Sequence, residues 1–472
     1  MKPRAFCIAP FLGGLASLWL AACSGGEPVS GTEDGGLGVG DVAVDQVAIA
    51  DAMPADAKAD VKVDAKADAT TADLAGVKEA CDNRLDDNGD GRVDEGCAAS
   101  PNLRPDQAWQ DLGFVAMPTG EEAAPTRTFQ AAGKNQAMLL IGRDAEAVPA
   151  YVWAETIVSP LGIQVLSPKT WATSYNRAAP NAGESTALVG MSPQVSVPAG
   201  PWTFGFVRAT KVPLEYKGTP SPGWLHLGVV SRADIAAPKP LVLDLDVWLV
   251  GGPETADVFG KSWQWQQMSA KVASIWKAAG VSLGTVLMLD MPKEEAKKYR
   301  YLDNVLVADA TNELNSVYVA IGKLRPKSTA VTVVVVAGLL DSKGAGVASG
   351  VSQIGGVTGM AGSRLGGIAI AIDDKQWQEV AKAGPTSQGV GDIWGVVLAH
   401  EVGHFLGLWH TDEFDGTLHD TLQDTPPCEK AGATLTAEVC TAQAKYLMFW
   451  APKGTKVSAD QAVVVRRHPG LR

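Results

Sequence analysis

The sequence predicts an α/β (α+β) domain with a mixed, twisted sheet over residues 236–472. A β-sandwich accessory domain over residues 99–235 and a disordered tether precede it. Three observations support this prediction. Strand-like and helical runs alternate after residue 236. Residues 99–235 hold short runs rich in Val, Ile and aromatic residues, separated by Gly, Pro and Asn. Residues 24–78 contain no aromatic residue and cannot form a core.

The first residues, MKPRAFCIAPFLGGLASLWLAAC, are typical of an export signal over residues 1–22. Lys2 and Arg4 are its charged start, and the apolar stretch is too short and glycine-rich to span a bilayer. LAAC resembles a bacterial lipobox, which implies lipid modification of Cys23. Ser24, in place of aspartate, implies by the same resemblance anchoring to the outer membrane or surface of a Gram-negative bacterium. A plain secretory signal is the alternative.

Residues 23–78 are expected to form the tether. Within them, residues 41–70 carry seven aspartates against three lysines and repeat a loose DAKAD unit. This composition buries too little apolar surface to offset the entropy lost on folding. An acidic interaction tail is the alternative.

Residues 79–98 contain a candidate calcium loop, CDNRLDDNGDGRVDEGC. The loop matches the start of the D-x-[DN]-x-[DN]-G pattern, but Cys97 stands at the twelfth position, where an EF-hand has glutamate. It resembles Cys-bracketed, Asp-rich calcium loops of bacterial surface proteins, and a solvated acidic turn is the alternative. The candidate Ca²⁺ ligands are Asp86, Asn88, Asp90, Asp94 and Glu95.

The cysteines predict disulfides in an exported protein. Cys7 leaves with the signal and Cys23 takes lipid, so an even set of four remains. Three pairings are open. The local one is preferred because each pair lies within one segment: Cys81–Cys97 and Cys428–Cys440.

The β region is predicted to contain six to eight strands. In PWTFGFV, the side chains of Trp202, Phe204 and Phe206 alternate as in a half-buried strand. We expect His226 to be structural. The predicted strand runs are AMLLIGRD, AYVWAETIVS, LGIQVLS, TALVGMSPQVSVPAG, PWTFGFVRAT and GWLHLGVVSR.

The region after residue 236 is predicted to alternate between strands and helices. Asp244 and Asp246 share a face of the first strand, and the second helix has an apolar stripe that includes Leu324. The glycine-rich residues 344–367 lack a phosphate-loop pattern, so we expect a mobile cleft edge. The predicted elements are strand 241–250, helix 261–280, strand 281–289, helix 311–324 and the central strand 329–340.

HEVGHFLGLWH, residues 400–410, holds three of the six histidines. It lies in a helical run for which Asp392 is the predicted N-cap and Gly407 the predicted C′ residue. His400 and His404 lie one turn apart on one face, where two imidazoles can bind one Zn²⁺. A turn at Gly407 can bring His410 back as the third ligand.

The string resembles the zinc signature of the metzincin metallopeptidases. His410-Thr411, the DTP of residues 424–426 and IGGVTGMAGSRLGGIAIAIDD narrow the resemblance to the pappalysin (cytophagalysin-like) family. The last of these segments resembles the strand that lines the family's substrate cleft. The resemblance covers roughly residues 240–466 and implies a Met-turn at Met448, with Glu401 as general base.

Two positions depart from the family pattern. Members commonly have Asn two residues before the Met-turn methionine and Tyr two residues after it, where this chain has Tyr446 and Trp450. Tryptophan offers only an N–H donor. The departures put the oxyanion-stabilising group in question.

The resemblance implies an exported zinc endopeptidase that hydrolyses peptide bonds in extracellular or cell-surface proteins, with Glu401 as general base and acid. The competing hypothesis is a catalytically weak or inactive, calcium-stabilised surface binding or adhesion lipoprotein. The net charge of −12 and the lack of a basic cluster exclude nucleic acid as a partner. We expect a monomer whose partners are protein or peptide substrates and the membrane.

Overall fold

A computed structural model gives the structure of the chain. The described residues all belong to one compact unit. Cys23, the tether, the calcium-loop residues and Cys81–Cys97 lie outside the described residues, so these expectations stay predictions. The described residues are 101–118, 124–132, 137–167, 180–191, 193, 197–210, 220–232, 240–305, 311–341, 346–385, 389, 391–414, 416, 418–428 and 435–472.

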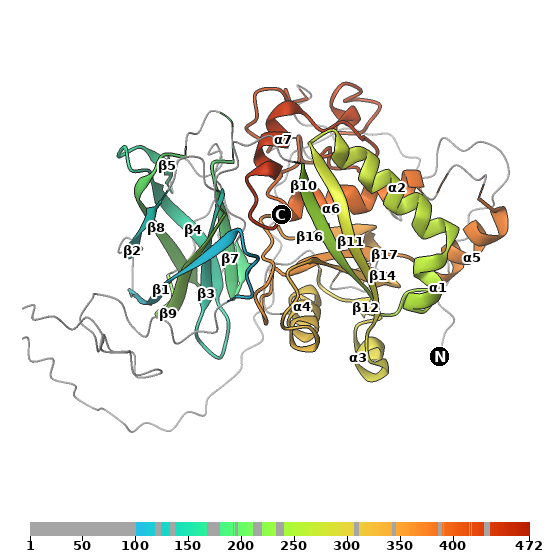
Figure 1. Cartoon of the computed structure of the whole chain (residues 1–472), viewed down its shortest axis with the longest axis horizontal. Helices are drawn as coiled ribbons and strands as arrows, with labels where there is room; N and C mark the ends of the chain where they lie inside the picture. Colours follow the sequence, from blue (N-terminus) through green and yellow to red (C-terminus); the bar gives the residue numbers. More distant parts are fainter. Residues whose placement is uncertain are drawn as a thin grey trace, which may run out of the picture. The chain divides into compact units, whose positions relative to one another are not determined.

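The first part of the described chain is built from two antiparallel sheets (Figure 1). One has the order β1-β9-β3-β7, and the other has the order β2-β8-β4-β5, with β6 paired to β4. The strands are β1 (Gln107–Met117), β2 (Thr126–Ala131), β3 (Ala137–Asp144), β4 (Tyr151–Val158), β5 (Gln164–Leu166), β6 (Asn181–Ala182), β7 (Glu184–Val189), β8 (Gly200–Ala209) and β9 (Gly223–Arg232).

One apolar cluster joins the two sheets. Trp202, Phe204 and Phe206 of β8 are fully buried in it, as their alternation predicts, together with Leu140 of β3. Phe204 and Phe206 meet edge to face, with ring centroids 5.9 Å apart. His226 of β9 is buried, and its Nε2 lies 2.7 Å from an Asp111 carboxylate oxygen.

The second part of the described chain is a mixed α/β region whose main sheet has the order β11-β10-β13-β17-β16. Its strands are parallel except β16, which pairs antiparallel with β17. A small sheet has the order β12-β14-β15. The strands are β10 (Leu241–Leu249), β11 (Val281–Asp290), β12 (Tyr301–Leu302), β13 (Val331–Val336), β14 (Gly338–Leu340), β15 (Gly346–Ala348), β16 (Gly350–Ser352) and β17 (Gly367–Ala371).

Helices cover both faces of the main sheet (Figure 1). Helices α2 and α6 share a core with one face, and α4 shares a second core with the other. The central strand β13 is therefore apolar on both faces, as predicted. The predicted strand over residues 329–340 is divided, however, because residues 338–340 form β14 of the small sheet. The helices are α1 (Ala256–Lys261), α2 (Trp263–Lys277), α3 (Lys293–Lys298), α4 (Glu313–Leu324), α5 (Asp374–Ala383), α6 (Val396–Phe405) and α7 (Ala459–Arg466).

Three sequence predictions in this region need comment. Leu324 does not join the buried stripe of α4 but is 42% exposed, because α4 ends at this residue. The glycine-rich residues 344–367 include the strands β15 and β16. Asp244 and Asp246 of β10 form ion pairs, with Arg472 at 2.6 Å and Arg325 at 2.9 Å.

Among the described residues, no helix is long and apolar enough to cross a membrane.

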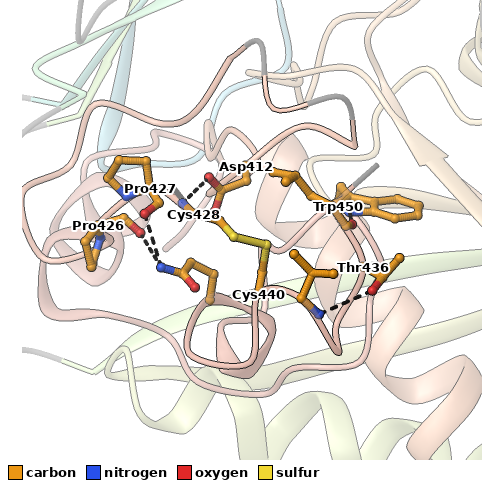
Figure 2. Close-up of a disulfide and its surroundings, with 10 residues drawn as sticks. Asp412, Pro426, Pro427, Cys428, Thr436, Cys440 and Trp450 are labelled. Atoms are coloured by element: carbon orange, nitrogen blue, oxygen red, sulfur yellow. Dashed lines mark hydrogen bonds between the residues drawn. A yellow bond between two sulfur atoms is a disulfide. The ribbon is translucent and has the colours of Figure 1, made fainter. Parts of the chain in front are cut away.

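A disulfide joins Cys428 and Cys440, the local pairing that the sequence favours (Figure 2). It closes a loop between His410 and Met448. Asp412 binds the same loop through its Oδ1 atom, which accepts a hydrogen bond from the Cys428 backbone N–H at 2.8 Å. Covalent and polar links therefore hold a segment with a small apolar core of its own.

We expect replacement of both Cys428 and Cys440 by serine to lower the free energy of unfolding by about 3 kcal/mol, because an open loop adds entropy to the unfolded chain. Thermal unfolding of the oxidised parent and the double variant measures the change. Reductant should lower the midpoint of the parent by more than that of the variant, which retains only the predicted Cys81–Cys97 disulfide. Equal midpoints without reductant would contradict this expectation.

Candidate metal centre

Helix α6 carries the first two histidines of the HEVGHFLGLWH string, and every one of its residues is buried. Its start differs from the prediction. A π-helical turn, Gly391–Gly395, precedes it, so Asp392 is not its N-cap; Gly395 holds that position without a side-chain cap. A Cβ on Gly395 would lie 2.8 Å from the Lys271 Cβ of α2. Gly395 has helical dihedral angles (φ −68°, ψ −36°), so the helical backbone continues from the π-helical turn into α6 without a capped break.

The end of α6 agrees with the prediction. Gly407 has a φ of 96°, in the left-handed region that glycine adopts without strain. Its N–H donates to the His404 carbonyl (2.8 Å), and the Leu408 N–H donates to the Gly403 carbonyl (2.9 Å). These two bonds form a Schellman motif. The motif reverses the chain and returns His410 toward the helix.

The three histidines converge through their Nε2 atoms. His410 Nε2 lies 3.2 Å from His400 Nε2 and 3.0 Å from His404 Nε2. Two nitrogen ligands of one tetrahedral zinc ion are separated by about 3.3 Å, because each Zn–N bond is about 2.0–2.1 Å long. The separations therefore fit a shared ion.

Each histidine makes a hydrogen bond through its other ring nitrogen. His400 Nδ1 donates to the Leu447 carbonyl (2.6 Å), and His404 Nδ1 donates to the Leu408 carbonyl (2.8 Å). His410 Nδ1 donates to the Glu413 carboxylate (2.9 Å). These acceptors place the ring proton on Nδ1 and leave the Nε2 lone pair to face the centre. Three facing lone pairs repel one another unless a cation lies among them.

Burial keeps two of the imidazoles neutral. Desolvation lowers the pKa of His404 to about 3 and lowers that of His400 well below its usual value. The neighbouring histidines contribute to the lowering of both pKa values. Neutral imidazole is the form that binds a metal, so the donor set fits Zn²⁺.

Met448, the predicted Met-turn residue, packs against α6 at Gly403, next to His404. Its side chain is fully buried against α6, since a Cβ on Gly403 would lie 2.4 Å from the Met448 Sδ atom. The same turn supplies the Leu447 carbonyl that accepts from His400. The backbone carbonyl of Met448 also accepts a hydrogen bond from the Thr411 N–H at 2.8 Å. One turn thus contacts both His400 of α6 and the segment that carries His410.

Glu401 is a buried carboxyl beside the histidines, with 5% of its surface exposed. Burial raises its pKa to about 8. Strand β16 approaches it closely, because a Cβ on Gly350 would lie 2.8 Å from Glu401 Oε1. The strand beside this carboxyl is therefore the edge strand β16. It lies just before residues 354–374, the segment whose sequence resembles the strand that lines the family's substrate cleft.

Tyr446 and Trp450, the two departures from the family pattern, make other contacts. The Tyr446 hydroxyl donates to the Asp424 carbonyl at 2.9 Å and accepts from Lys456 Nζ at 3.1 Å. The Trp450 indole N–H donates to the Leu435 carbonyl. Trp450 therefore has its single donor engaged inside the disulfide loop.

Glu413 is a site residue that the sequence reasoning missed. We expect Glu413→Ala to weaken zinc affinity about 10- to 100-fold, because His410 loses the acceptor that fixes its ring. Glu413→Gln keeps an amide oxygen as acceptor and should lose less. Competition with a chromogenic chelator measures the affinity. Glu438→Ala, an exposed glutamate in the nearby loop, is the control. Parent-like affinity of Glu413→Ala would show that this contact does not support the centre.

The comparisons with known proteins add little to this description. No family model and no curated protein matches the sequence. A metalloproteinase-II from Bacteroides fragilis is 13% identical, with a TM-score of 0.23, over 46% of this chain and 62% of its own. A family two carbohydrate esterase from Cellvibrio japonicus is 11% identical, with a TM-score of 0.11, over 51% of this chain and 81% of its own. Both likenesses are weak. The chain is a mixed α/β protein with several sheets and a three-histidine group that could hold a metal ion.

Proposed function

We propose that the protein is a zinc-dependent endopeptidase in which His400, His404 and His410 hold the ion and Glu401 is the general base. The observation that carries the proposal is the convergence of three Nε2 atoms beside a buried carboxyl. Three protein ligands leave a coordination position open, as in catalytic rather than structural zinc sites. Met448 and the Schellman turn at Gly407 support the same centre.

The chemistry follows from the groups on α6. Bound zinc supplies Lewis acidity, which polarises a carbonyl and lowers the pKa of water. A bound cation would favour the ionised form of Glu401 and so oppose the rise in pKa that burial causes. As a carboxylate, Glu401 would accept a proton from the attacking water and pass it to the amine that leaves. The Nδ1 hydrogen bonds keep the three imidazoles in one tautomer and orientation throughout.

The proposal extends to architecture and location. We infer a metzincin-like domain over residues 236–472, related to the pappalysins, and a β-sandwich accessory domain over residues 99–235. We further infer export, lipid attachment at Cys23, and Ca²⁺ bound by residues 79–98. These inferences rest on the sequence motifs. Retention of Cys23→Ser in the membrane fraction would contradict the lipid anchor.

Peptide cleavage by the purified protein tests the proposed activity. A diverse peptide mixture is incubated with zinc-loaded, chelator-stripped and reloaded protein, and mass spectrometry reads the cut sites. We expect internal cuts that disappear on stripping and return on reloading. Removal of single terminal residues would indicate an exopeptidase instead. Zinc binding without any cleavage would favour the surface binding protein.

Gly350 gives a test of how Glu401 is positioned. A Cβ there would lie 2.7 Å from Glu401 Cγ and 2.7 Å from Val397 Cγ1, so one of these groups must move. We expect Gly350→Ala to keep zinc and to lower cleavage by about 10- to 10²-fold, since small misplacements of a catalytic group have effects of this size. The control is Gly346→Ala on β15, where an added Cβ meets nothing within 4 Å. Equal rates for the two variants would contradict the steric argument.

A further inference from the structure

Strand β7 of the first region is hydrogen-bonded to the end of the zinc helix through the segment that follows β16. The Gly355 N–H donates to the His404 carbonyl at 3.1 Å, and the Gly356 N–H donates to the Phe405 carbonyl at 2.8 Å. The buried Thr186 hydroxyl of β7 donates to the Gly355 carbonyl. A continuous chain of hydrogen bonds therefore runs from β7 to His404, a proposed zinc ligand.

A second residue of β7 fixes the far end of this segment. Glu184 is 1% exposed, and its carboxylate accepts from the Ser363 hydroxyl at 3.0 Å and the Arg364 N–H at 2.6 Å. Arg143 of β3 lies 3.7 Å from the same carboxylate and donates to the Gly362 carbonyl at 3.2 Å. The segment 354–366 is thus held at both ends by the first region of the chain.

Apolar packing makes a third link, at the turn itself. Leu188 of β7 is 1% exposed and belongs to the same core as Phe405 and Leu408. A Cβ on Gly407 would lie 2.9 Å from Leu188 Cδ2. Leu188 therefore packs against the glycine that reverses the chain between His404 and His410.

We propose that β7 is a positioning element of the metal centre, in which Thr186 and Leu188 hold the turn between His404 and His410. The Nε2 atoms of these two histidines lie 3.0 Å apart only while that turn keeps its shape. The first region is then required for tight zinc binding rather than being a separable accessory domain. This inference concerns metal affinity, so it stands or fails whether or not the protein cleaves peptides.

The neighbouring strand β3 supplies a matched control. In the antiparallel register Leu140 of β3 is opposite Ala187, beside Leu188, and is also fully buried. Leu140 points to the other face, into the cluster between the two sheets, whereas Leu188 points to the core of the zinc helix. Leu188→Ala and Leu140→Ala remove the same atoms from equally buried sites, and both should destabilise the fold. Only the first removes a contact with Gly407.

The test measures zinc affinity in the full-length chain. Chelator competition is carried out at a temperature where circular dichroism shows each variant to be folded. We expect Leu188→Ala to bind zinc about 10-fold more weakly than the parent or worse, the scale of outer-shell effects on metal sites. Leu140→Ala should stay within about 3-fold of the parent, because its contacts do not reach the centre. Similar changes in both variants, or none in either, would overturn the proposal.

Thr186→Val keeps the shape of the side chain and removes the hydroxyl that bonds to Gly355, so it tests the proposal even if Leu188→Ala fails to fold. Its control is Thr203→Val on β8, whose hydroxyl bonds to Thr128 at 2.9 Å at the surface. With Co²⁺ as probe, the visible absorption spectrum reports ligand geometry. We expect Thr186→Val alone to shift this spectrum and to weaken binding. A parent-like spectrum and affinity in Thr186→Val would refute the role of β7.

Discussion

Replacement of Glu401 by glutamine is expected to leave zinc bound and to lower peptide hydrolysis by about 10²-fold or more. Glutamine keeps the shape of the side chain and a hydrogen-bonding group, but its amide cannot accept a proton at neutral pH. The side chain lies in a closed space between α6 and β16, as the approach of Gly350 shows, so water cannot readily replace the lost carboxylate. The loss should therefore appear in kcat more than in KM.

The measurement pairs metal content with cleavage rate. Glu401→Gln should contain about one zinc per chain, like the parent, since the three imidazoles are unchanged. Glu379→Gln makes the same chemical change on the exposed face of α5, where Glu379 lies 3.9 Å from Lys375, and should cleave at the parent rate. If Glu401→Gln also cleaves at the parent rate, the protein is a peptidase with a different base.

Local sequence patterns were enough to predict the helices and strands whose apolar residues follow a regular pattern. The helix α2 and the strand β8 show the periodicity of their elements, and β13 is a continuous apolar run; each forms within the residues that the sequence predicts for it. The strands β1 and β2 were not singled out. Their sequences, QAWQDLGFVAM and TRTFQA, mix polar and apolar residues, and their burial is set by the sheets they join.

The convergence of the three histidines could be predicted because its geometry is local. One helical turn relates His400 to His404, and a glycine that tolerates positive φ returns His410. The surroundings of the ligands could not be predicted in the same way. Gly350 is separated from Glu401 by about fifty residues of sequence. The sheet register brings the two residues together, and only then is there no room for a Cβ at position 350. For Glu413 a weak signal existed, since a carboxylate three residues after a ligand is within reach in a turn.

Loss of the third ligand is expected to have the largest effect on the metal itself. We expect His410→Ala to retain less than about one tenth of the zinc of the parent after dialysis, and to lose peptide cleavage with it. His410 completes the proposed ligand set, because its Nε2 lies within 3.2 Å of the Nε2 atoms of His400 and His404. Without it, two imidazoles remain, and two protein ligands seldom hold a catalytic zinc ion.

The position of His410 outside the helix makes this result informative. His400 and His404 are buried in α6, where alanine would also open a cavity. His410 follows the turn and is partly exposed, so its loss should disturb packing less. The informative result is a His410→Ala variant that lacks zinc but is as thermally stable as the metal-free parent. That result would identify His410 as a ligand rather than as a support for the fold.

The control replaces a histidine that is buried elsewhere. His226→Ala removes the imidazole that lies 2.7 Å from Asp111 in the first region, and it should lower stability while leaving zinc content unchanged. Metal analysis, thermal unfolding and cleavage rate are measured on the same preparations of parent and variants. If His410→Ala keeps stoichiometric zinc, the ion is held by another group, and the three-histidine assignment fails. If it loses zinc but still cleaves peptides at the parent rate, the metal has no part in the reaction.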